Sequence, residues 1–240
     1  VRLVAKDLRA VTRYSRNLSS DAVADVGNDL MREIAYAFAD KEDQCGINGD
    51  AGSTYGGIKG LKNAVTSSLA GSIAGASGTS TDWSNFTLGV FSKALGTLPE
   101  YAAGDAVWLT SRAFYYEVMQ DLELDSGGTL PEDVRSRGAV GLFRGLPVII
   151  SQVMPLSATT AENVCYLGDF AMGASFGDRQ QDRIEFSETA TVGGESLWTQ
   201  GQAVFKGQVG VLGFERFDIN IHDVGTSSTA GPIVAVRSVA

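Results

Sequence analysis

The most reactive side chains are few in this sequence and lie far apart. It contains one histidine, His222, and two cysteines, Cys45 and Cys165. The cysteines lack the paired spacing of a zinc or redox motif, so we expect both to be reduced residues in or near the core. His222 follows a run of alternating apolar residues, which places it on the polar face or at the end of a strand. A transition-metal site is therefore not expected, and we expect no cofactor.

Two glycine-containing segments come close to catalytic or nucleotide-binding motifs but fail at the decisive residues. In Gly71–Gly75 the serine stands one place too early for a nucleophile elbow. Gly52 and Gly57 have the separation of P-loop glycines, but Ile58 and Lys59 occupy the positions that require lysine and serine or threonine. The pattern argues against an enzyme and indicates a turn-rich connector between the neighbouring elements.

Charge is distributed unevenly along the chain. The net charge is −9, yet one acidic residue, Asp7, stands among the five cations of residues 1–16, which are Arg2, Lys6, Arg9, Arg13 and Arg16. An acidic body with one basic segment argues against a nucleic-acid reader, which presents a concentrated basic face. Two interpretations remain: the cations lie on a solvated strand face, or they contact acidic surface on neighbouring subunits.

Acidic residues are concentrated in a later segment that we predict to be a long loop, from Asp121 to Arg137. A loop of this length inside a compact domain is usually functional or mobile. It is either a solvated charged loop or part of a subunit interface. Its candidate interface residues are Asp121, Glu123, Asp125, Glu132 and Asp133.

The elements that position these charges begin with an extended segment over residues 1–16. A helix then begins near Ser19, Ser20 or Asp21, which offer capping oxygens. We expect it to be the longest helix, at about 24 residues or ~36 Å. Its apolar stripe has spacings of three and four and comprises Val23, Val26, Leu30, Ile34 and Phe38.

The middle of the chain alternates between helix and strand patterns, which suggests an α/β layer. The composition of residues 66–82 predicts a loop or an edge strand. A helix is expected from Asp82 to about Gly96, with four apolar residues on one face. A short buried strand, Ala106–Thr110, is followed by a helix that Ser111 can cap. The four residues of the first helix face are Trp83, Phe86, Val90 and Ala94.

The last third of the chain is predominantly strand-like. Leu146–Val153 is an apolar run, and Asp178–Arg183 has like charges four residues apart, which we interpret as a helical turn. Apolar and polar residues alternate over Ala203–Val211 and again over Phe217–Ile221. This pattern predicts two antiparallel strands that pack on the long helix.

Four segments, taken in order, resemble one protein family. They are Gly141–Ser151 (GLFRGLPVIIS), Met154-Pro155, Leu167–Phe170 (LGDF) and Gly213–Asp218 (GFERFD). In this order they resemble the major capsid proteins of tailed bacteriophages, the Hong Kong 97-like shell subunits. The long helix and the elements of the middle region fall where that family has matching elements, so the resemblance covers nearly the whole chain.

The resemblance implies an α+β fold of the Hong Kong 97-like kind. A long spine helix and an antiparallel sheet would form a peripheral domain, and an α/β layer would form an axial domain. The expected bounds are 1–80 and 196–240 for the peripheral domain and 81–195 for the axial domain. Family members carry an N-terminal arm and an extended loop before the point where this chain begins. We therefore expect a truncated or processed chain that folds but assembles poorly.

The implied function is structural: a major capsid protein that forms pentamers and hexamers of an icosahedral shell around phage double-stranded DNA. The expected location is the virion, after assembly in the bacterial cytoplasm. The chain itself is the expected partner, with the portal, scaffold or protease of the same phage as further partners, and no membrane contact is expected. One alternative is an encapsulin-type nanocompartment shell. An alternative of another class is a soluble α+β domain that binds or transforms a small molecule.

Overall fold

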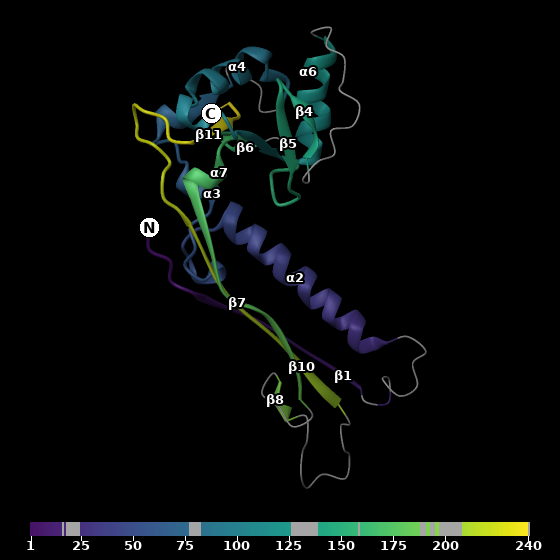
Figure 1. Ribbon diagram of the computed structural model, residues 1–240. Coiled ribbons are helices and arrows are strands. Elements are labelled where there is room, and N and C mark those ends of the chain that lie inside the picture. Colours follow the sequence, from purple (N-terminus) through teal and green to yellow (C-terminus); the bar gives the residue numbers. More distant parts are fainter. Residues whose placement is uncertain are drawn as a thin grey trace. The chain divides into compact units, whose positions relative to one another are not determined.

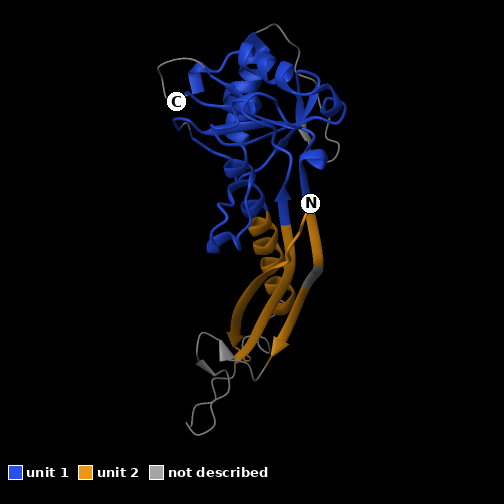
Figure 2. Ribbon diagram, turned by 90° about the vertical axis from the view of Figure 1, so that its left-hand side faces the viewer, with its two compact units in different colours: residues 1, 43–175, 219–240 blue, residues 2–42, 176–218 orange. Residues whose placement is uncertain are grey.

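The chain forms two compact units (Figure 2). The computed structural model describes residues 1–15, 17, 25–76, 83–125, 139–157, 159–187, 191–192, 195–196 and 208–239. Unit 1 comprises residues 1, 43–175 and 219–240, and unit 2 comprises residues 2–42 and 176–218. Both units contain helix and sheet, as an α+β fold requires. The peripheral and axial bounds expected from the sequence stay a prediction.

Unit 2 is built on a three-stranded sheet (Figure 1). Its strand order is β1 (Lys6–Ser15), β10 (Gln208–Ile221) and β7 (Ala174–Ser187). β1 pairs antiparallel with β10, from Lys6 opposite Phe217 to Ser15 opposite Gln208. The expected extended segment near the N-terminus is thus confirmed over β1.

The two strands expected near the C-terminus are one strand. β10 continues without a break from Gln208 to Ile221, and the two-residue alternation continues through its middle, where Gly213 and Glu215 are buried. The interpretation of two strands was wrong because the glycines at 210 and 213 resemble turn residues. In the folded chain they are ladder residues, opposite Arg13 and Ala10. Residues 203–207 lie outside the described residues.

The long helix α2 (Val26–Asn48) has 23 residues, so its expected length is confirmed. Asp25 caps it, because its Oδ1 atom accepts hydrogen bonds from the backbone N–H groups of Gly27 and Asn28 at 3.1 and 3.3 Å. The expected start near Ser19, Ser20 or Asp21 was wrong, since the helix begins at Val26; those three residues themselves lie outside the described residues. Ile34 and Phe38 form a small core with Val211 of β10, so the expected packing of strand on helix is confirmed.

β7 replaces the helical turn expected at Asp178–Arg183. Charges four residues apart share one face of a helix, but they also share one face of a strand, because four is a multiple of the two-residue strand period. The charge pattern therefore could not distinguish the two. Pairing with β10 makes this segment a strand, and Ile184 of β7 packs against the core of unit 2.

Unit 1 contains a six-stranded mixed sheet with the order β2, β11, β6, β3, β5, β4. The pairs β11–β2 and β3–β5 are parallel, and the other three are antiparallel. The strands are β2 (Ile73–Gly75), β11 (Ile233–Arg237), β6 (Asn163–Gly168), β3 (Val107–Thr110), β5 (Leu146–Ile150) and β4 (Ala139–Phe143). Three expectations are confirmed. A short strand, β3, precedes Ser111, and the apolar run after Leu146 forms strand β5. The edge strand expected within residues 66–82 is β2.

Each face of this sheet has its own core. Trp108 and Val236 belong to the larger core, and their neighbours Leu109 and Ala235 pack into the smaller one. The larger core is covered by α4 (Leu88–Thr97), α5 (Arg112–Phe114) and a π-helical turn, Tyr115–Met119, that continues into α6 (Gln120–Asp125). The smaller core includes α3 (Leu61–Ala64) and the end of α2.

Short elements lie between the longer ones. They are the 3-10 turns Ser53–Tyr55, Ala70–Ser72, Trp83–Asn85 and Glu100–Ala102, the helix α7 (Phe170–Gly173), and the strands β8 (Thr191–Val192) and β9 (Glu195–Ser196). The first of these turns lies in the expected connector. Ser111 caps α5 as expected, since its Oγ accepts from the N–H of Phe114 at 3.2 Å.

Two expectations for unit 1 were wrong. The helix expected from Asp82 begins at Leu88, because Thr87 is extended, with φ −124° and ψ 161°. Trp83 and Phe86 nevertheless reach the core, where both rings meet Phe114 edge-on at 5.3 and 5.0 Å. The loop expected from Asp121 to Arg137 is helical up to Asp125, and residues 126–137 lie outside the described residues. Helix α6 continues the preceding turn there, and its side chains Asp121 and Asp125 are exposed to solvent.

Candidate assembly surfaces

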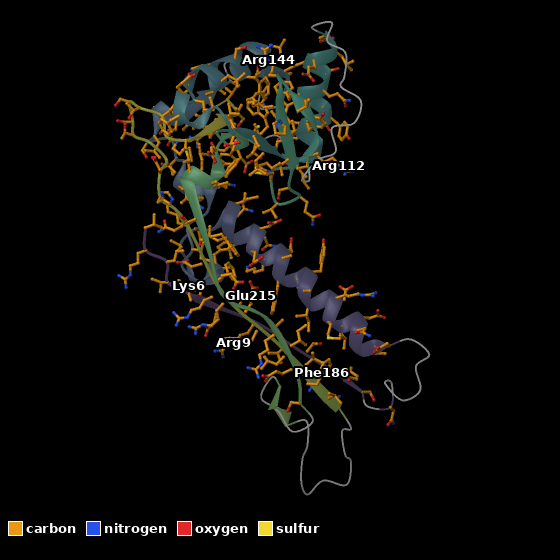
Figure 3. All side chains as sticks on the ribbon, in the orientation of Figure 1. Lys6, Arg9, Arg112, Arg144, Phe186 and Glu215 are labelled. Atoms are coloured by element: carbon orange, nitrogen blue, oxygen red, sulfur yellow. The ribbon has the colours of Figure 1, made fainter. Side chains whose placement is uncertain are left out.

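The basic segment lies on the edge of the sheet in unit 2. Side chains of β1 alternate between half-buried and exposed, so that Arg9 and Arg13 face solvent while Lys6 lies on the opposite, half-buried side. Figure 3 shows Lys6 and Arg9 along this strand. An edge strand presents unpaired backbone groups to solvent or to another chain. The sequence therefore places two of its arginines on the exposed side of an edge strand.

Neighbouring side chains hold Arg9 in place. Its Nη2 atom lies 3.1 Å from Oδ2 of Asp7, and its guanidinium carbon lies 5.5 Å from the ring centre of Phe214 on β10. Asp7 is shared, because its Oδ1 atom is 2.8 Å from Nε of Arg216. These pairs are substantially exposed, so each contributes little to stability. Their effect is to order one carboxylate between two arginines, which leaves the group with a net positive charge.

An apolar pair lies beside these charges. Val11 of β1 is opposite Leu212 of β10, and the two side chains are 53% and 36% exposed. Facing residues in an antiparallel ladder contact each other directly. The next outward pair along the ladder is Arg9 with Phe214. We call the exposed side of β1 and β10, consisting of Arg9, Val11, Arg13, Leu212 and Phe214, the strand face.

The acidic residues lie on helix α6 of unit 1. Asp121 and Asp125 are exposed and one helical turn apart, and Glu123 is half-buried. Oε1 of Glu123 accepts from the backbone N–H of Arg144 at 3.3 Å, and Nη2 of Arg144 donates to Oγ of Ser92 at 2.8 Å. Glu123 thus ties α6 to the β4–β5 hairpin. Asp121 and Asp125 remain exposed carboxylates on the solvent side.

Exposed apolar residues accompany the acidic ones. Tyr116 is 49% exposed and Leu124 is 52% exposed, and Glu117 beside Tyr116 is also exposed. We call the exposed residues of this helical segment, Tyr116, Glu117, Asp121, Leu124 and Asp125, the helix face. Sequence reasoning missed Tyr116 and Leu124. Their exposure depends on the π-helical turn and on which side of the helical segment packs against the core.

The expected interface residues fall into two groups that lie in different units. Arg2, Lys6, Arg9 and Arg13 belong to unit 2, and Asp121, Glu123 and Asp125 belong to unit 1. Arg16, Glu132 and Asp133 lie outside the described residues. Sequence reasoning missed Leu212, Phe214 and Arg216. The signal that could have found them is the two-residue alternation through residues 211–217, once residues 208–221 are treated as one continuous strand.

The reactive side chains found in the sequence do not converge. Cys45 and Cys165 are both buried, as expected, and His222 is exposed just after β10. Burial raises the pKa of the Cys165 thiol, so it stays protonated at neutral pH and is a poor nucleophile. Within the described ranges there is no group of three or more histidine, cysteine or acidic residues that could hold a metal.

No helix in the described part of the chain is both long and apolar enough to cross a membrane.

Comparison with known proteins identifies the family. A family model described as the phage capsid family matches residues 1–225, so the chain belongs to the phage capsid family. Its members are the shell-forming proteins of phages, and the chain accordingly has a structural role. A comparison with curated protein sequences gave no match.

Solved structures agree on the fold. The capsid protein of an empty GTA particle is similar with a TM-score of 0.73 and 18% identity, covering 99% of this chain and 74% of that one. A protein of Mycobacterium phage Bobi is similar with a TM-score of 0.67 and 16% identity, covering 98% and 72%. An encapsulin from Synechococcus elongatus has a TM-score of 0.64 and 14% identity, covering 98% and 73%. The Hong Kong 97-like fold expected from the ordered motifs is thereby confirmed.

Proposed function

We propose that this protein is the major capsid protein of a tailed phage or prophage. Copies of the chain assemble through pentamers and hexamers into an icosahedral shell around double-stranded DNA. The observation that carries the proposal is the match of the phage capsid family over residues 1–225, on a chain whose fold agrees with capsid structures over nearly its full length. In this role the protein has no catalytic activity.

Rings of identical subunits require two different complementary patches on each chain, because their contacts run head to tail. The strand face is cationic and contains the exposed Val11–Leu212 pair. The helix face is anionic and contains the exposed Tyr116 and Leu124. The strand face of one copy therefore binds the helix face of the next, and opposite charges set the register of the contact.

The remaining partners follow from the same role. The shell is assembled in the bacterial cytoplasm with the portal, scaffold or protease of the same phage, and the protein is then part of the virion. The packaged DNA is enclosed without sequence-specific binding. The net charge of −9 supports this, since carboxylates repel phosphates and keep the genome from adhering to the wall.

An encapsulin shell is the second candidate. It is favoured by the similarity of the Synechococcus elongatus encapsulin, which matches the fold almost as well as the phage proteins do. The family match favours the phage shell over it. The two candidates differ in their contents, since a phage shell encloses DNA and an encapsulin encloses a protein cargo.

The test is negative-stain electron microscopy with light scattering on the full-length gene product. We expect closed particles or rings of five and six subunits, and nuclease-resistant DNA in particles recovered from lysed host cells. Particles that contain a cargo enzyme and no DNA would establish the encapsulin candidate instead. A monodisperse monomer at every protein concentration and ionic strength would contradict both shell functions and favour a soluble α+β binding domain.

A further inference from the structure

A polar cavity lies in unit 1 beside the last strand of the sheet. It has a volume of about 380 Å³ and is bordered by α3, by the segment before β6 and by Arg237 of β11. Ala161 is the one apolar residue among those that line it. Small-molecule sites of this size are usually lined by apolar side chains with a few polar groups. Polar groups on nearly all of the lining residues point to a small ligand that forms several hydrogen bonds.

The wall formed by residues 159–163 is fixed by the C-terminal end of the chain. The N–H of Ala161 donates to the carbonyl of Val239 at 2.8 Å, and Glu162 and Ser238 exchange two hydrogen bonds of 2.9 Å each. Ala161 has a φ of 54°, a left-handed conformation that is uncommon for residues other than glycine. Such conformations persist where the surrounding structure enforces them. The wall is therefore held in one shape before any ligand arrives.

The cavity lining contains a buried amide with an unused acceptor. Asn163 is 5% exposed, and its Nδ2 atom donates to the carbonyl of Val65 at 2.9 Å and to the hydroxyl of Tyr166 at 3.3 Å. The bond to Val65 fixes the orientation, because a flipped amide would face that carbonyl with its own oxygen. Among the described residues, Oδ1 of Asn163 is buried without a hydrogen-bond partner. It requires an N–H or O–H donor from a ligand or from water.

The charges around the cavity leave one cation uncompensated. Nζ of Lys62 lies 2.7 Å from Oε1 of Glu162, so these two groups neutralise each other. Nε of Arg237 donates to the carbonyl of Ala161 at 2.8 Å, which orients the guanidinium. Within the described part of the chain, Arg237 makes no ion pair. Its Nη donors have the fork geometry that matches the oxygens of carboxylates and phosphates.

We propose that this cavity binds a small oxyanion that also carries its own hydrogen-bond donor, for which hydrogen phosphate is the simplest example. Arg237 binds the anionic oxygens, and Oδ1 of Asn163 accepts from the P–O–H group. A site with a buried acceptor selects for the donor-bearing ligand, because an oxyanion without a proton would place oxygen against oxygen. This inference is independent of the shell function.

Phosphate and sulfate form a matched pair for the test. Both are tetrahedral oxyanions, but at pH 7 phosphate carries at least one O–H group and sulfate carries none. Isothermal titration calorimetry of the purified protein with each salt, at constant ionic strength, should give a phosphate Kd at least tenfold lower than the sulfate Kd. Equal affinities, or no detectable phosphate binding, would overturn the proposal.

Variants locate the binding within the cavity. Arg237→Gln should weaken phosphate binding at least tenfold, whereas Lys93→Gln, which removes an exposed cation from α4, should leave it unchanged. Asn163→Leu should remove the preference for phosphate over sulfate. If melting curves show that this variant does not fold, the proposal is still tested by the preference of the wild-type protein for phosphate over sulfate and by the Arg237→Gln result. Phosphate binding that survives Arg237→Gln at full strength would refute the assignment.

Discussion

Gly213 of β10 lies directly against Ile34 of α2: a Cβ atom at position 213 would be 2.7 Å from Cγ2 of Ile34 and 2.9 Å from Cζ of Phe38. Cβ atoms do not approach other atoms this closely, so only glycine lets the strand and the helix meet at this point. This is the position at which the GFERFD segment begins.

The first prediction follows from that approach. Gly213→Ala should destabilise the protein by about 1–3 kcal/mol, because the added methyl group overpacks a closed core. Gly96→Ala is the control: it lies in α4, nothing lies within 4 Å of its Cβ position, and alanine there should stabilise by about 0.5–1 kcal/mol. Urea denaturation measures both changes. Equal effects of the two substitutions would mean that β10 and α2 do not pack as described.

A second close approach joins Gly141 to Tyr115. A Cβ atom on Gly141 of β4 would collide with the hydroxyl of Tyr115 in the π-helical turn. Gly141→Ala should therefore cost about 1–3 kcal/mol. In the background Tyr115→Phe, which lacks the hydroxyl, the same substitution should cost at least about 0.5 kcal/mol less, the smallest coupling typical of contacting residues. A double-mutant cycle in urea measures this coupling, and strictly additive effects would rule out the contact.

A third prediction concerns the apolar stripe of α2. Ile34→Asp should prevent folding, since burying an unpaired carboxylate costs several kcal/mol. Ile34 is 6% exposed, and Tyr36 on the same helix is 64% exposed, so Tyr36→Asp is the matched control and should fold normally. Leu30→Asp should be milder than Ile34→Asp, because Leu30 is only partly buried. Circular dichroism melting distinguishes these outcomes. A cooperatively melting Ile34→Asp protein would show that the stripe is misplaced.

A fourth prediction is a pH dependence from Cys165. Burial raises the pKa of this thiol above that of the unfolded chain, which is about 8.5. The folded state therefore favours the neutral thiol. The contribution of this thiol to the free energy of unfolding is fully present below about pH 8.5 and is lost as the pH rises above that value. One group contributes a slope of up to about 1.4 kcal/mol per pH unit. The free energy of unfolding should fall accordingly between about pH 8.5 and 10.

Cys165→Val tests the origin of that slope. The variant should be less sensitive to pH in this range, even if its stability at pH 7 differs from the wild type. Above pH 10 a second decrease is expected in both proteins, because burial also raises the pKa of Tyr166. Identical slopes for the two proteins between pH 8.5 and 10 would exclude Cys165 as the source.

The fifth prediction tests the proposed contact between the strand face and the helix face. Arg9→Glu or Asp121→Arg alone should reduce the yield of assembled particles at least tenfold, because each places like charges together. The double variant should recover most of the yield, since the pair is restored with its signs exchanged. Lys93→Glu serves as a charge-changing control on α4 and should assemble normally. Light scattering and sedimentation measure assembly, and a double variant no better than the single ones would reject this pairing.

Several parts of the fold could be predicted because their signal is local. The stripe through Ile34 and Phe38 has helical spacing, and the hydroxyl of Ser111 stands where a cap is needed. The charge spacing over Asp178–Arg183 fits helix and strand equally, and the glycines of β10 resemble turn residues. These local patterns are ambiguous, and pairing with distant strands resolved them.

The candidate surfaces could be predicted only in part. The sequence predicted a cationic strand near the N-terminus and an acidic segment after Asp121. It could not predict that Arg9 lies over Phe214, or that Val11 and Leu212 form an exposed pair, because β1 and β10 are about two hundred residues apart in the chain. Local periodicity does not specify which strands pair or in which register.

By itself, the sequence determined the family through the order of its motifs, and its helical spacing identified Ile34 and Phe38 as buried residues of the long helix. The tertiary structure alone decided the close approach of Gly213 to Ile34, the exposed pair on the strand face and the cavity beside Arg237. The physical reason is that residue spacing and motif order are properties of the sequence, whereas these contacts join chain segments that meet only after folding.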